Sequence, residues 1–532
     1  MKKSSAKKRT ILIIIIAVIT TGIIGGFILN SIVQKKFRQT AEQLMPVVEI
    51  KYADIHTNLF TASVSLDSLD IFYRPDTGLQ SHSHHFYFPH AQISGINFFK
   101  FISSKDLSVA AIKLDNAEIK FDRFLFDKKD SSQIDILSLI HIPFDNLAIS
   151  SFSITGANVW IHSEKKDNAL LNGNILVNDI VIHHLNKTIS KDSVQFKGIV
   201  CSLFDINYPV PGSYHTLQIK EFEISSKDSL LHIDSLKLLP EYGKFEYGNK
   251  VGHQVDRVDA LIPQIKISGL DVSKLLQQKL SAQSIVVVNS NVHVFRDRRL
   301  PRQLKEQPMP LGYLEKIPLQ IHADTFKIKN ADIVSEEFPK VGPKSGYIKI
   351  ENLSISMLPF LNHRSSKDPD HLETYIEGSI MGSGTIHASV YFPLIENKPY
   401  MVKGTITNLE LTKLNPSAQN LGKMYIQSGV LNNLLFQFSA NDKKASGEIV
   451  GEYHDLVIDK LKDDGITVAK LPSFALRNII IPKNKDKSLE VQKRTGKIDY
   501  DRDPTRLVTF YLLKALLSGI RASFDFGFLL PS

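Results

Sequence analysis

One eight-residue pattern recurs along this 532-residue chain and constrains its fold more than any other feature. Apolar residues occupy positions 1, 3, 6 and 8, and the other four positions are not apolar, as in residues 64–71 (VSLDSLDI). With 43% apolar residues, about two strict copies are expected by chance. The chain has six, so the repeat is real although degenerate. The other strict copies are residues 91–98 (AQISGINF), 217–224 (LQIKEFEI), 231–238 (LHIDSLKL), 265–272 (IKISGLDV) and 348–355 (IKIENLSI), and looser copies are 175–182 and 404–411.

The spacing within each half of the repeat is two, the period of a β-strand with one buried face. Leu66 and Leu69 are three residues apart, so a regular strand would place them on opposite faces. One extra residue, accommodated as a β-bulge, would return Leu69 to the apolar side. The alternative is a tight turn at residues 67–68, 94–95 or 268–269, which would leave hairpin arms of only three residues. Both interpretations predict an extended antiparallel sheet with one apolar and one polar face.

A second motif supports this prediction. It places Asn or Gly before a small residue, a combination that suits a bend between two strand halves. The first two copies start 40 residues apart and the last two 41 residues apart, which predicts two similar β modules. The copies are residues 114–119 (LDNAEI), 154–159 (ITGANV), 287–292 (VVNSNV) and 328–333 (IKNADI).

Few segments have the 3.6-residue period of a helix. Residues 273–283 (SKLLQQKLSAQ) are the clearest predicted helix, because Leu275, Leu276 and Leu280 fall on one side. Residues 296–318 are rich in Arg, Lys and Pro and predict a linker or long loop. This segment is either a solvated connector between the modules or a collar for anionic lipid head groups.

The N-terminal segment has the pattern of a membrane anchor. Residues 10–34 carry no charge, and the nearly continuous apolar run at 11–29 would span about 28 Å as a helix. Five basic residues precede it and three follow, which predicts a cytoplasmic N-terminus and an exported body. A retained anchor is favoured over a cleaved signal peptide, because the apolar run is long and no small-x-small cleavage site is clear. Residues 31–45 predict a short helix that Pro46 ends.

The net charge of +9 is concentrated at the same end of the chain. Residues 1–40 hold eight basic residues and no acidic one, so the remainder is nearly neutral and nucleic-acid binding is not expected. Cys201 is the only cysteine, which excludes an internal disulfide. We expect it to be a buried or half-buried small apolar residue.

The last segment, residues 505–523 (TRLVTFYLLKALLSGIRAS), predicts an amphipathic helix. Arg506, Lys514 and Arg521 fall within about 80° on a helical wheel, and apolar residues cover the rest. Such a helix suits a membrane interface or a hydrophobic groove. A helix that caps the end of the sheet is the close alternative, and a second spanning helix is least favoured because charges lie inside it.

No motif of a known catalytic chemistry was found. The chain lacks a phosphate-binding Gly-x4-Gly-Lys-Ser/Thr loop, a Gly-x-Ser-x-Gly elbow and a His-Glu-x-x-His helix. His82, His84, His85 and His90 are the one local cluster that could hold a metal, in what we predict to be a polar loop. Adventitious exposed histidines are favoured over zinc, so no metal, no cofactor and no enzymatic activity are expected.

Several segments carry a family resemblance. They are residues 378–386 (GSIMGSGTI), 404–416 (GTITNLELTKLNP), 426–431 (IQSGVL) and 447–456 (GEIVGEYHDL), together with 55–60 (IHTNLF) after the anchor. With these segments the chain resembles the AsmA-like proteins of Gram-negative envelopes, a group that includes TamB. The resemblance implies a single-pass inner-membrane protein whose periplasmic β-rich groove is lined with apolar side chains. It also implies a role in moving phospholipid to the outer membrane or in outer-membrane biogenesis, and no catalytic residues.

Two departures from the family limit this resemblance. The chain is shorter than the long members, and it ends in the basic, apolar segment after residues 494–502 (RTGKIDYDR) rather than in their terminal domain.

The predicted organisation follows from these features. Residues 1–9 are a basic cytoplasmic tail, 10–31 the transmembrane anchor, 32–300 the first periplasmic β module, 301–316 the linker, 317–504 the AsmA-like β module and 505–523 the amphipathic helix. The predicted fold is mostly β, an elongated, curled antiparallel sheet with an apolar groove and few helices.

The functional hypothesis is that acyl chains of phospholipid cover the apolar face. The alternative is an anchored, non-enzymatic scaffold for outer-membrane assembly factors, with a fully packed apolar face. The residues predicted to line the lipid groove are Val64, Leu66, Leu69, Ile71, Ile219, Phe222, Ile267, Leu270, Ile350 and Leu353.

Overall fold

The computed structural model describes residues 48–524 with thirteen gaps, and residues 35, 38–39 and 41–42 before them. The predicted tail and anchor at residues 1–31 lie outside the described residues. Among the residues that are described, every helix is too short or too polar to cross a membrane. The gaps are residues 59–60, 74–83, 98–99, 101–103, 105, 123–144, 164–165, 184–193, 276, 366–367, 396–397, 463 and 477–490.

The protein is built mainly of strands, which account for 62% of the structure against 14% for helices. This confirms the predicted mostly β fold. The chain divides into two compact units, which we call the first and second units. Of the described residues, those up to 213 and those at 217–234 form the first unit, and those at 214–216 and 235–524 form the second. The predicted linker at 301–316 therefore falls inside the second unit.

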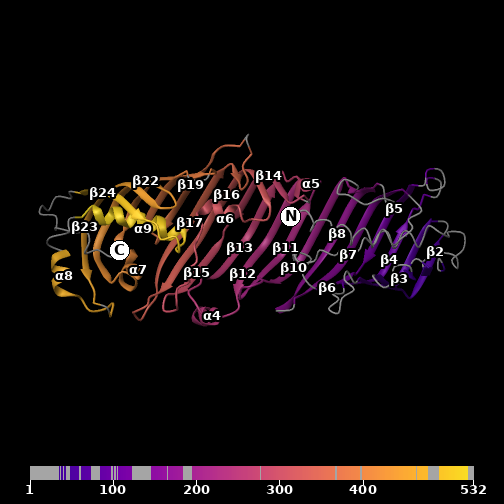
Figure 1. The fold of residues 1–532 in the computed structure, drawn as a ribbon, viewed down its shortest axis with the longest axis horizontal. Coiled ribbons are helices and arrows are strands. Elements are labelled where there is room, and N and C mark those ends of the chain that lie inside the picture. The colour runs from indigo at the N-terminus through magenta and orange to yellow at the C-terminus, as the bar shows by residue number, and fades with distance from the viewer. Residues whose placement is uncertain are drawn as a thin grey trace. The chain divides into compact units, whose positions relative to one another are not determined.

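The first unit is a sheet of successive strands (Figure 1). Strands β1 and β2 both pair with β3, which pairs with β4; β4 pairs with β5 and β6, and β7 and β8 follow, with β9 and β10 on β8. The bounds are β1 (Val48–Lys51), β2 (Asp54–Asn58), β3 (Ser63–Tyr73), β4 (His84–Ser94), β5 (Asp106–Asp115), β6 (Glu118–Asp122), β7 (Asn146–Ser163), β8 (Lys166–Ile182), β9 (Val194–Gln195) and β10 (Gly198–Pro209); the division between the units falls in β11 (His215–Ser225) and β12 (Leu230–Pro240).

The second unit repeats this arrangement and extends it. Strand β13 pairs with β14 and β15, both pair with β16, and β17, β19, β20, β21, β22, β23 and β24 follow in order. The strands are β13 (Arg257–Ser268), β14 (Lys279–Val288), β15 (Asn291–Asp297), β16 (Gln320–Phe338), β17 (Gly346–Leu358), β18 (Phe360–Leu361), β19 (His371–Ile380), β20 (Gly384–Pro393), β21 (Tyr400–Glu410), β22 (Met424–Ala440), β23 (Lys444–Lys460) and β24 (Gln492–Asp501). The helices are α4 (Lys244–Val251), α5 (Val272–Leu275), α6 (Pro310–Leu314), the 3-10 helix η3 (Leu411–Leu414), α7 (Asn415–Asn420), α8 (Lys470–Ala475) and α9 (Val508–Ala522).

Two sequence predictions are corrected here. The sheet is mixed rather than antiparallel, because β5 and β6 run parallel to β7, and β14 and β15 run parallel to β16. The helix predicted at 273–283 is only the short α5, and β14 begins at Lys279. Pairing of β14 with both β13 and β16 overrides the helical spacing of the leucines.

The second sequence motif lies at these parallel crossings. Its copies pair directly with each other, Leu114 with Ile154 and Val287 with Ile328. The bend residues Asn116, Gly156, Asn289 and Asn330 all have positive φ, between 52° and 60°. The backbone N–H of Asn116 donates to Thr155 O at 2.8 Å, and that of Asn289 donates to Lys329 O at 2.9 Å. The same crossing is thus built once in each unit.

The fifth position of the eight-residue repeat is a left-handed residue in seven of the eight copies. This conformation turns the chain so that position 6 returns to the side of positions 1 and 3, and Gly, Asn, Asp and Ser tolerate it better than bulky residues. Glu221, the fifth residue of the copy at 217–224, is the exception. The residues and their φ angles are Ser68 (54°), Gly95 (66°), Asp179 (51°), Ser235 (52°), Gly269 (65°), Asn352 (51°) and Asn408 (55°).

The predicted bulge is present in β17, whose register against β19 shifts between Glu351 and Ser354, whereas the alternative tight turn with short hairpin arms is not formed at residues 67–68, 94–95 or 268–269. Strands β3, β12 and β17 continue through their left-handed residue, whereas β4 and β13 end one residue before Gly95 and Gly269. The predicted bulge between Leu66 and Leu69 is a kink without a register shift. Strand β4 has the same three-residue spacing at its buried Phe88 and Ala91, so neither strand carries an extra residue relative to the other.

Candidate functional site

A continuous row of apolar residues and glycines crosses the second unit from β16 to β24. Directly opposed residues of neighbouring strands point to the same side, so this row marks one face of the sheet, which we call the apolar face. The row is Ile328, Ile355, Ile376, Ala388, Gly404, Phe436, Ile449 and Gly496, each paired with the next.

Exposure changes along this row. Ile328, Ile355, Ile376 and Ala388 are half-buried. Phe436, further along the row, is 5% exposed and belongs to a buried cluster with Tyr511 and Ala515 of α9. The apolar face is therefore partly open over β16 to β20 and covered by protein over β22 to β24.

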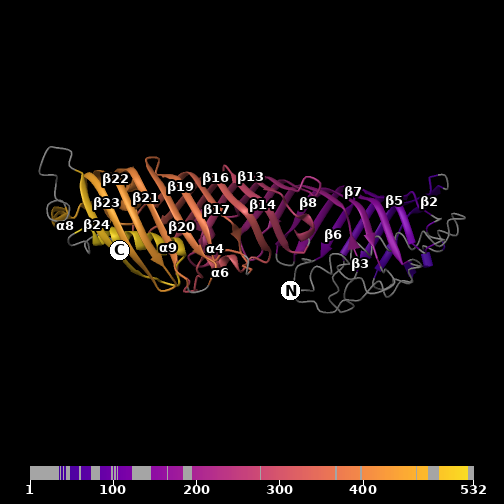
Figure 2. The same cartoon turned by 90° about the horizontal axis from the view of Figure 1, so that it is seen from above.

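Helix α9 provides much of this cover, and Figure 2 shows it along one side of the strands of the second unit. A Cβ atom added at Gly496 would lie 1.9 Å from Gly519 O, so the absence of a side chain lets the helix backbone approach β24. The Tyr511 hydroxyl donates to Asn441 O at 3.1 Å. This is the arrangement expected of a helix that caps the sheet. Arg506, Lys514 and Arg521 are half-buried, and their contact with a membrane interface stays a prediction.

The segment predicted as a linker also folds against the second unit. Gln307 N donates to Pro504 O at 2.7 Å, and Arg302 pairs with Asp503 at 2.8 Å. Met309 joins the buried cluster under α9, and Leu311 N donates to the Tyr400 hydroxyl at 3.2 Å. The basic segment and the N-terminus of α9 are therefore in contact.

The same strands carry a hollow of about 1210 Å³. Its lining includes six members of the apolar row, which are Ile328, Ile355, Ile376, Ala388, Gly404 and Phe436. Residues that flank the row also line it, such as Tyr375 and Glu377 on β19 and Lys403 and Thr405 on β21. The hollow is therefore bordered by both apolar and polar residues of these strands.

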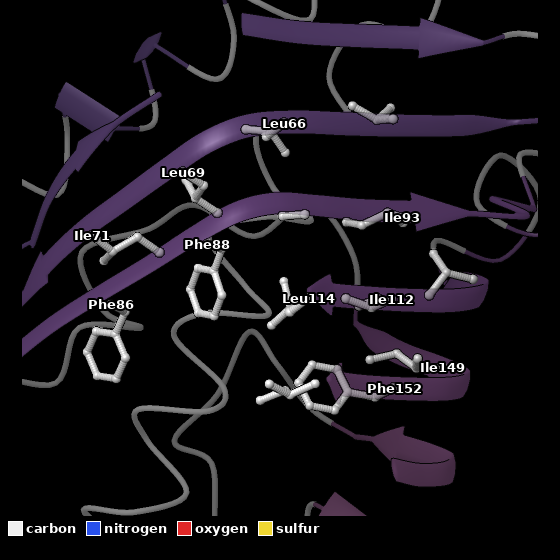
Figure 3. Close-up of a cluster of buried hydrophobic side chains, with 14 of the residues drawn as sticks. Leu66, Leu69, Ile71, Phe86, Phe88, Ile93, Ile112, Leu114, Ile149 and Phe152 are labelled. Carbon is white, nitrogen blue, oxygen red and sulfur yellow. The ribbon is translucent and has the colours of Figure 1, made fainter. Parts of the chain in front are cut away.

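The residues predicted to line a lipid groove fall into two environments. Val64, Leu66 and Leu69 are 0% exposed and Ile71 is 2% exposed, within one packed cluster of the first unit. Figure 3 shows Leu66, Leu69 and Ile71 among Phe86, Phe88, Leu114 and Phe152. Protein atoms surround these four side chains, and contact with lipid stays a prediction for them.

The other predicted lining residues differ from one another in how exposed they are. Ile219 and Phe222 on β11 and Ile350 on β17 are half-buried. Ile267, Leu270 and Leu353 are 7%, 3% and 6% exposed.

Sequence analysis missed the central members of the apolar row. Ile376, Ala388 and Phe436 lie outside every strict copy of the repeat. The sequence signal at these positions was the two-residue alternation of residues 372–380, 386–392 and 434–440. Such an alternation predicts a strand, but it does not predict which strands pair with each other.

The histidine cluster is on a strand and not in a loop. His84, His85 and His90 lie on β4, and His82 lies outside the described residues. The hydrogen bond from His90 holds the pKa of Asp67 below its ordinary value. His85 is hydrogen-bonded to Asp70, so His85 and His90 each contact a carboxylate of β3, and Asp67 also lies 3.1 Å from His56 Nε2. In the part of the chain that is described, no group of three or more His, Cys, Asp or Glu side chains could hold a metal ion.

Cys201 on β10 is partly buried, and this burial raises the pKa of its thiol to about 11. Such a thiol is protonated at neutral pH and therefore a poor nucleophile.

Comparison with known proteins gives no relative for this chain: no family model, no curated protein and no solved structure matches it.

Proposed function

We propose that this protein is an anchored, non-enzymatic envelope protein of the AsmA-like type, which binds phospholipid acyl chains on the apolar face of its second unit. Through this binding it contributes to phospholipid transport to the outer membrane or to outer-membrane biogenesis. In this proposal the anchor at 10–31 lies in the inner membrane with the N-terminus in the cytoplasm, and the β-rich body lies in the periplasm. Its partners are phospholipid and, for assembly, outer-membrane proteins.

The observation that carries the proposal is the half-buried part of the apolar row. Ile328, Ile355, Ile376 and Ala388 face the same side and remain partly open. Each methylene group moved from water to an apolar surface gains about 0.8 kcal/mol, so such a row favours an acyl chain over water. A row that crosses several strands can shield a chain along its length, which a single exposed side chain cannot do.

One observation favours the scaffold function for the first unit. Its predicted lining residues Val64, Leu66 and Leu69 are completely buried by protein. A packed interior gives a rigid support for partner proteins and leaves no space for an acyl chain. The two functions can therefore belong to different units of one chain.

Two neighbouring residues on β20 provide the test. Ala388 belongs to the apolar row, and Ser389 points to the opposite face. We expect full-length protein purified from membranes to carry phospholipid, measured by native mass spectrometry and by lipid extraction. Ala388→Asp places a carboxylate where the acyl chain lies and is expected to remove the lipid, whereas Ser389→Asp is expected to keep it.

A second pair of variants tests whether the loss of lipid comes from the substitution itself or from misfolding. Ile376→Asp and Tyr375→Asp repeat the comparison on β19, with circular dichroism to compare the folded state of all four variants. Wild-type protein that carries no phospholipid contradicts the proposal and favours the scaffold. Equal lipid loss from the substitutions on both faces contradicts the assignment of the apolar row.

A further inference from the structure

Four very exposed apolar side chains lie at one end of the strands of the second unit. Val341, Ile466, Leu471 and Phe474 are 62%, 70%, 84% and 63% exposed. They are four of the five most exposed large apolar side chains in the part of the chain that the structure describes, and Leu304, at 75%, is the fifth. Apolar surface that a fold gathers in water is typical of a contact with a partner or a membrane.

Three of the four belong to one short segment with a defined conformation. This segment, residues 461–475, follows β23 and ends with α8, and we call it the lobe; the structure describes all of it except residue 463. A β-bridge between Leu461 and Val468 closes its base. The backbone N–H of Ala469 donates to Lys460 O at 2.8 Å, which ties the lobe to the end of β23.

Helix α8 turns one side toward the sheet and the other away from it. On the inner side, Ser473 is 3% exposed, and its hydroxyl accepts the backbone N–H of Lys460 at 2.9 Å. Leu476, one turn further, is 1% exposed and belongs to a buried cluster. Leu471 and Phe474 lie on the outer side, so the core is filled without them.

The turn between β16 and β17 lies beside the lobe, and Lys423 joins the two. Its Nζ donates to Val341 O at 2.8 Å. A Cβ atom added at Gly342 would lie 3.1 Å from this Nζ, and one added at Gly465 would lie 3.3 Å from it. Val341 and Ile466 are the chain neighbours of these glycines. The four exposed apolar side chains therefore belong to one surface, which we call the edge surface.

The charges of the edge surface are mainly positive. Asp464 is the one acidic residue described in the turn and the lobe, and its carboxylate accepts the backbone N–H groups of Ile466 and Thr467 at 2.9 and 2.8 Å. The exposed lysines of the same two segments are Lys340, Lys344, Lys462 and Lys470.

The residue types of the edge surface fit a membrane better than a protein partner. Tyr347 and Tyr425 are exposed, and each is the second residue of its strand at this end of the sheet. Tyrosine and lysine beside exposed aliphatic residues are typical of a membrane–water interface, where the aliphatic groups reach the acyl chains. Lysine is depleted in interfaces between proteins, whereas it is attracted to anionic head groups.

We propose that the edge surface docks on a lipid bilayer with anionic head groups, and that Ile466, Leu471 and Phe474 enter its acyl region. This docking goes beyond the proposed function, because it gives the protein a membrane contact besides the predicted anchor. It does not require acyl chains to bind on the apolar face.

The experiment measures how full-length protein captures vesicles. The protein is held in nanodiscs, which accommodate the predicted anchor, and surface plasmon resonance gives the apparent affinity for added vesicles. The vesicles contain equal parts of phosphatidylglycerol and phosphatidylcholine, or phosphatidylcholine alone. We expect Ile466→Ser and Leu471→Ser each to weaken capture about tenfold, because each removes an aliphatic side chain from the acyl region. Both variants should keep the wild-type Tm, since the side chains are exposed.

The matched control is Leu304→Ser. Leu304 is as exposed as the residues of the lobe, but it lies in the chain between Arg302 and Gln307. These two residues contact Asp503 and Pro504, which follow β24 at the opposite ends of the strands. Leu304→Ser is therefore expected to capture vesicles like the wild type.

The lysines are tested by the lipid composition. Lys462→Gln and Lys470→Gln are each expected to weaken capture of the vesicles with phosphatidylglycerol about fivefold. The same variants should leave capture of phosphatidylcholine vesicles unchanged. Equal effects on both kinds of vesicle overturn the role of anionic head groups.

A fluorescent label reports insertion directly. A polarity-sensitive dye is attached to Leu471→Cys in a chain that also carries Cys201→Ser, and we expect its emission to shift to the blue when vesicles are added. The same dye on Leu304→Cys should show no shift. Capture by Ile466→Ser and Leu471→Ser at the wild-type level, or no blue shift at position 471, overturns the proposal.

The docking and the proposed function can fail separately. Wild-type protein that carries phospholipid but captures neither kind of vesicle overturns the docking, favours a protein partner for the edge surface, and leaves the proposed function in place. Wild-type protein that carries no phospholipid but captures vesicles through Leu471 contradicts the proposed function and supports the docking.

Discussion

The close approach of α9 to β24 allows a direct test of how the apolar face is covered. In Gly496→Ala the added methyl would lie 1.9 Å from Gly519 O and 2.8 Å from Ser523 N, distances that Cβ atoms essentially never show. The helix must therefore move by about 1 Å, and overpacking of this kind costs about 1–3 kcal/mol. Each kcal/mol lowers the Tm of a domain of about 150–250 residues by about 2–4 °C, and somewhat less for a larger unit. Calorimetry measures this fall, and the rate of tryptic cleavage at Lys514 and Arg521 reports whether α9 leaves the sheet.

The control is a glycine on the neighbouring strand and the same face. A Cβ atom at Gly451 would meet only Leu434 Cδ1, at an ordinary contact distance of 3.5 Å. Gly451→Ala is therefore expected to leave the stability unchanged or to raise it by about 0.4–1 kcal/mol, because alanine restricts the unfolded chain. If Gly496→Ala and Gly451→Ala have the same Tm and the same cleavage rate, the tight docking of α9 on β24 is refuted.

Three further predictions concern single residues. Ser68→Gly is expected to raise the free energy of unfolding in urea by up to about 1 kcal/mol, because glycine accepts the φ of 54° without strain; an unchanged or lower value contradicts this. The Thr505 hydroxyl and Arg302 hold the pKa of Asp503 at about 2, against an ordinary 3.8, so its stabilising effect is present above pH 3.8 and is lost as the pH falls toward 2. The Tm difference between wild type and Asp503→Asn should therefore shrink below pH 4, and a difference that stays constant from pH 7 to pH 2 argues against this linkage. Iodoacetamide should label Cys201 much more slowly in native than in urea-unfolded protein at pH 8, because burial raises the thiol pKa to about 11; equal rates would show an accessible thiolate.

The eight-residue pattern predicted a sheet with one apolar face, because its spacing of two and three residues reflects the backbone directly. The spacing between Leu66 and Leu69 required a local change of conformation, and the structure places it at Ser68. The pattern did not predict the parallel crossings, because pairing of β5 with β7 depends on contacts 40 residues apart in the chain. Local periodicity carries no information about which strands meet.

The candidate site was less predictable than the fold. The sequence indicated a cationic stripe on the C-terminal helix and a basic segment after β15, each from its own composition. Their contact through Arg302, Asp503 and Arg506 depends on how distant parts of the second unit fold together. The sequence did not predict exposure either, since Leu66 and Ile350 both occupy position 3 of the repeat but only Leu66 is fully buried.

The left-handed residues also restrict how the strands can be aligned during folding. Strands with similar apolar alternation could pair after a slip of two residues without exposing an apolar side chain. At the crossing in the second unit, such a slip would separate Asn289 from Asn330, whose side chains share a hydrogen bond of 2.8 Å. It would also place a left-handed residue of one strand opposite a regular residue of the next, so that backbone N–H and C=O groups there would lose their hydrogen-bond partners. A misaligned sheet is therefore less stable at every left-handed residue. A chain whose strands share the same apolar alternation thus keeps one preferred register.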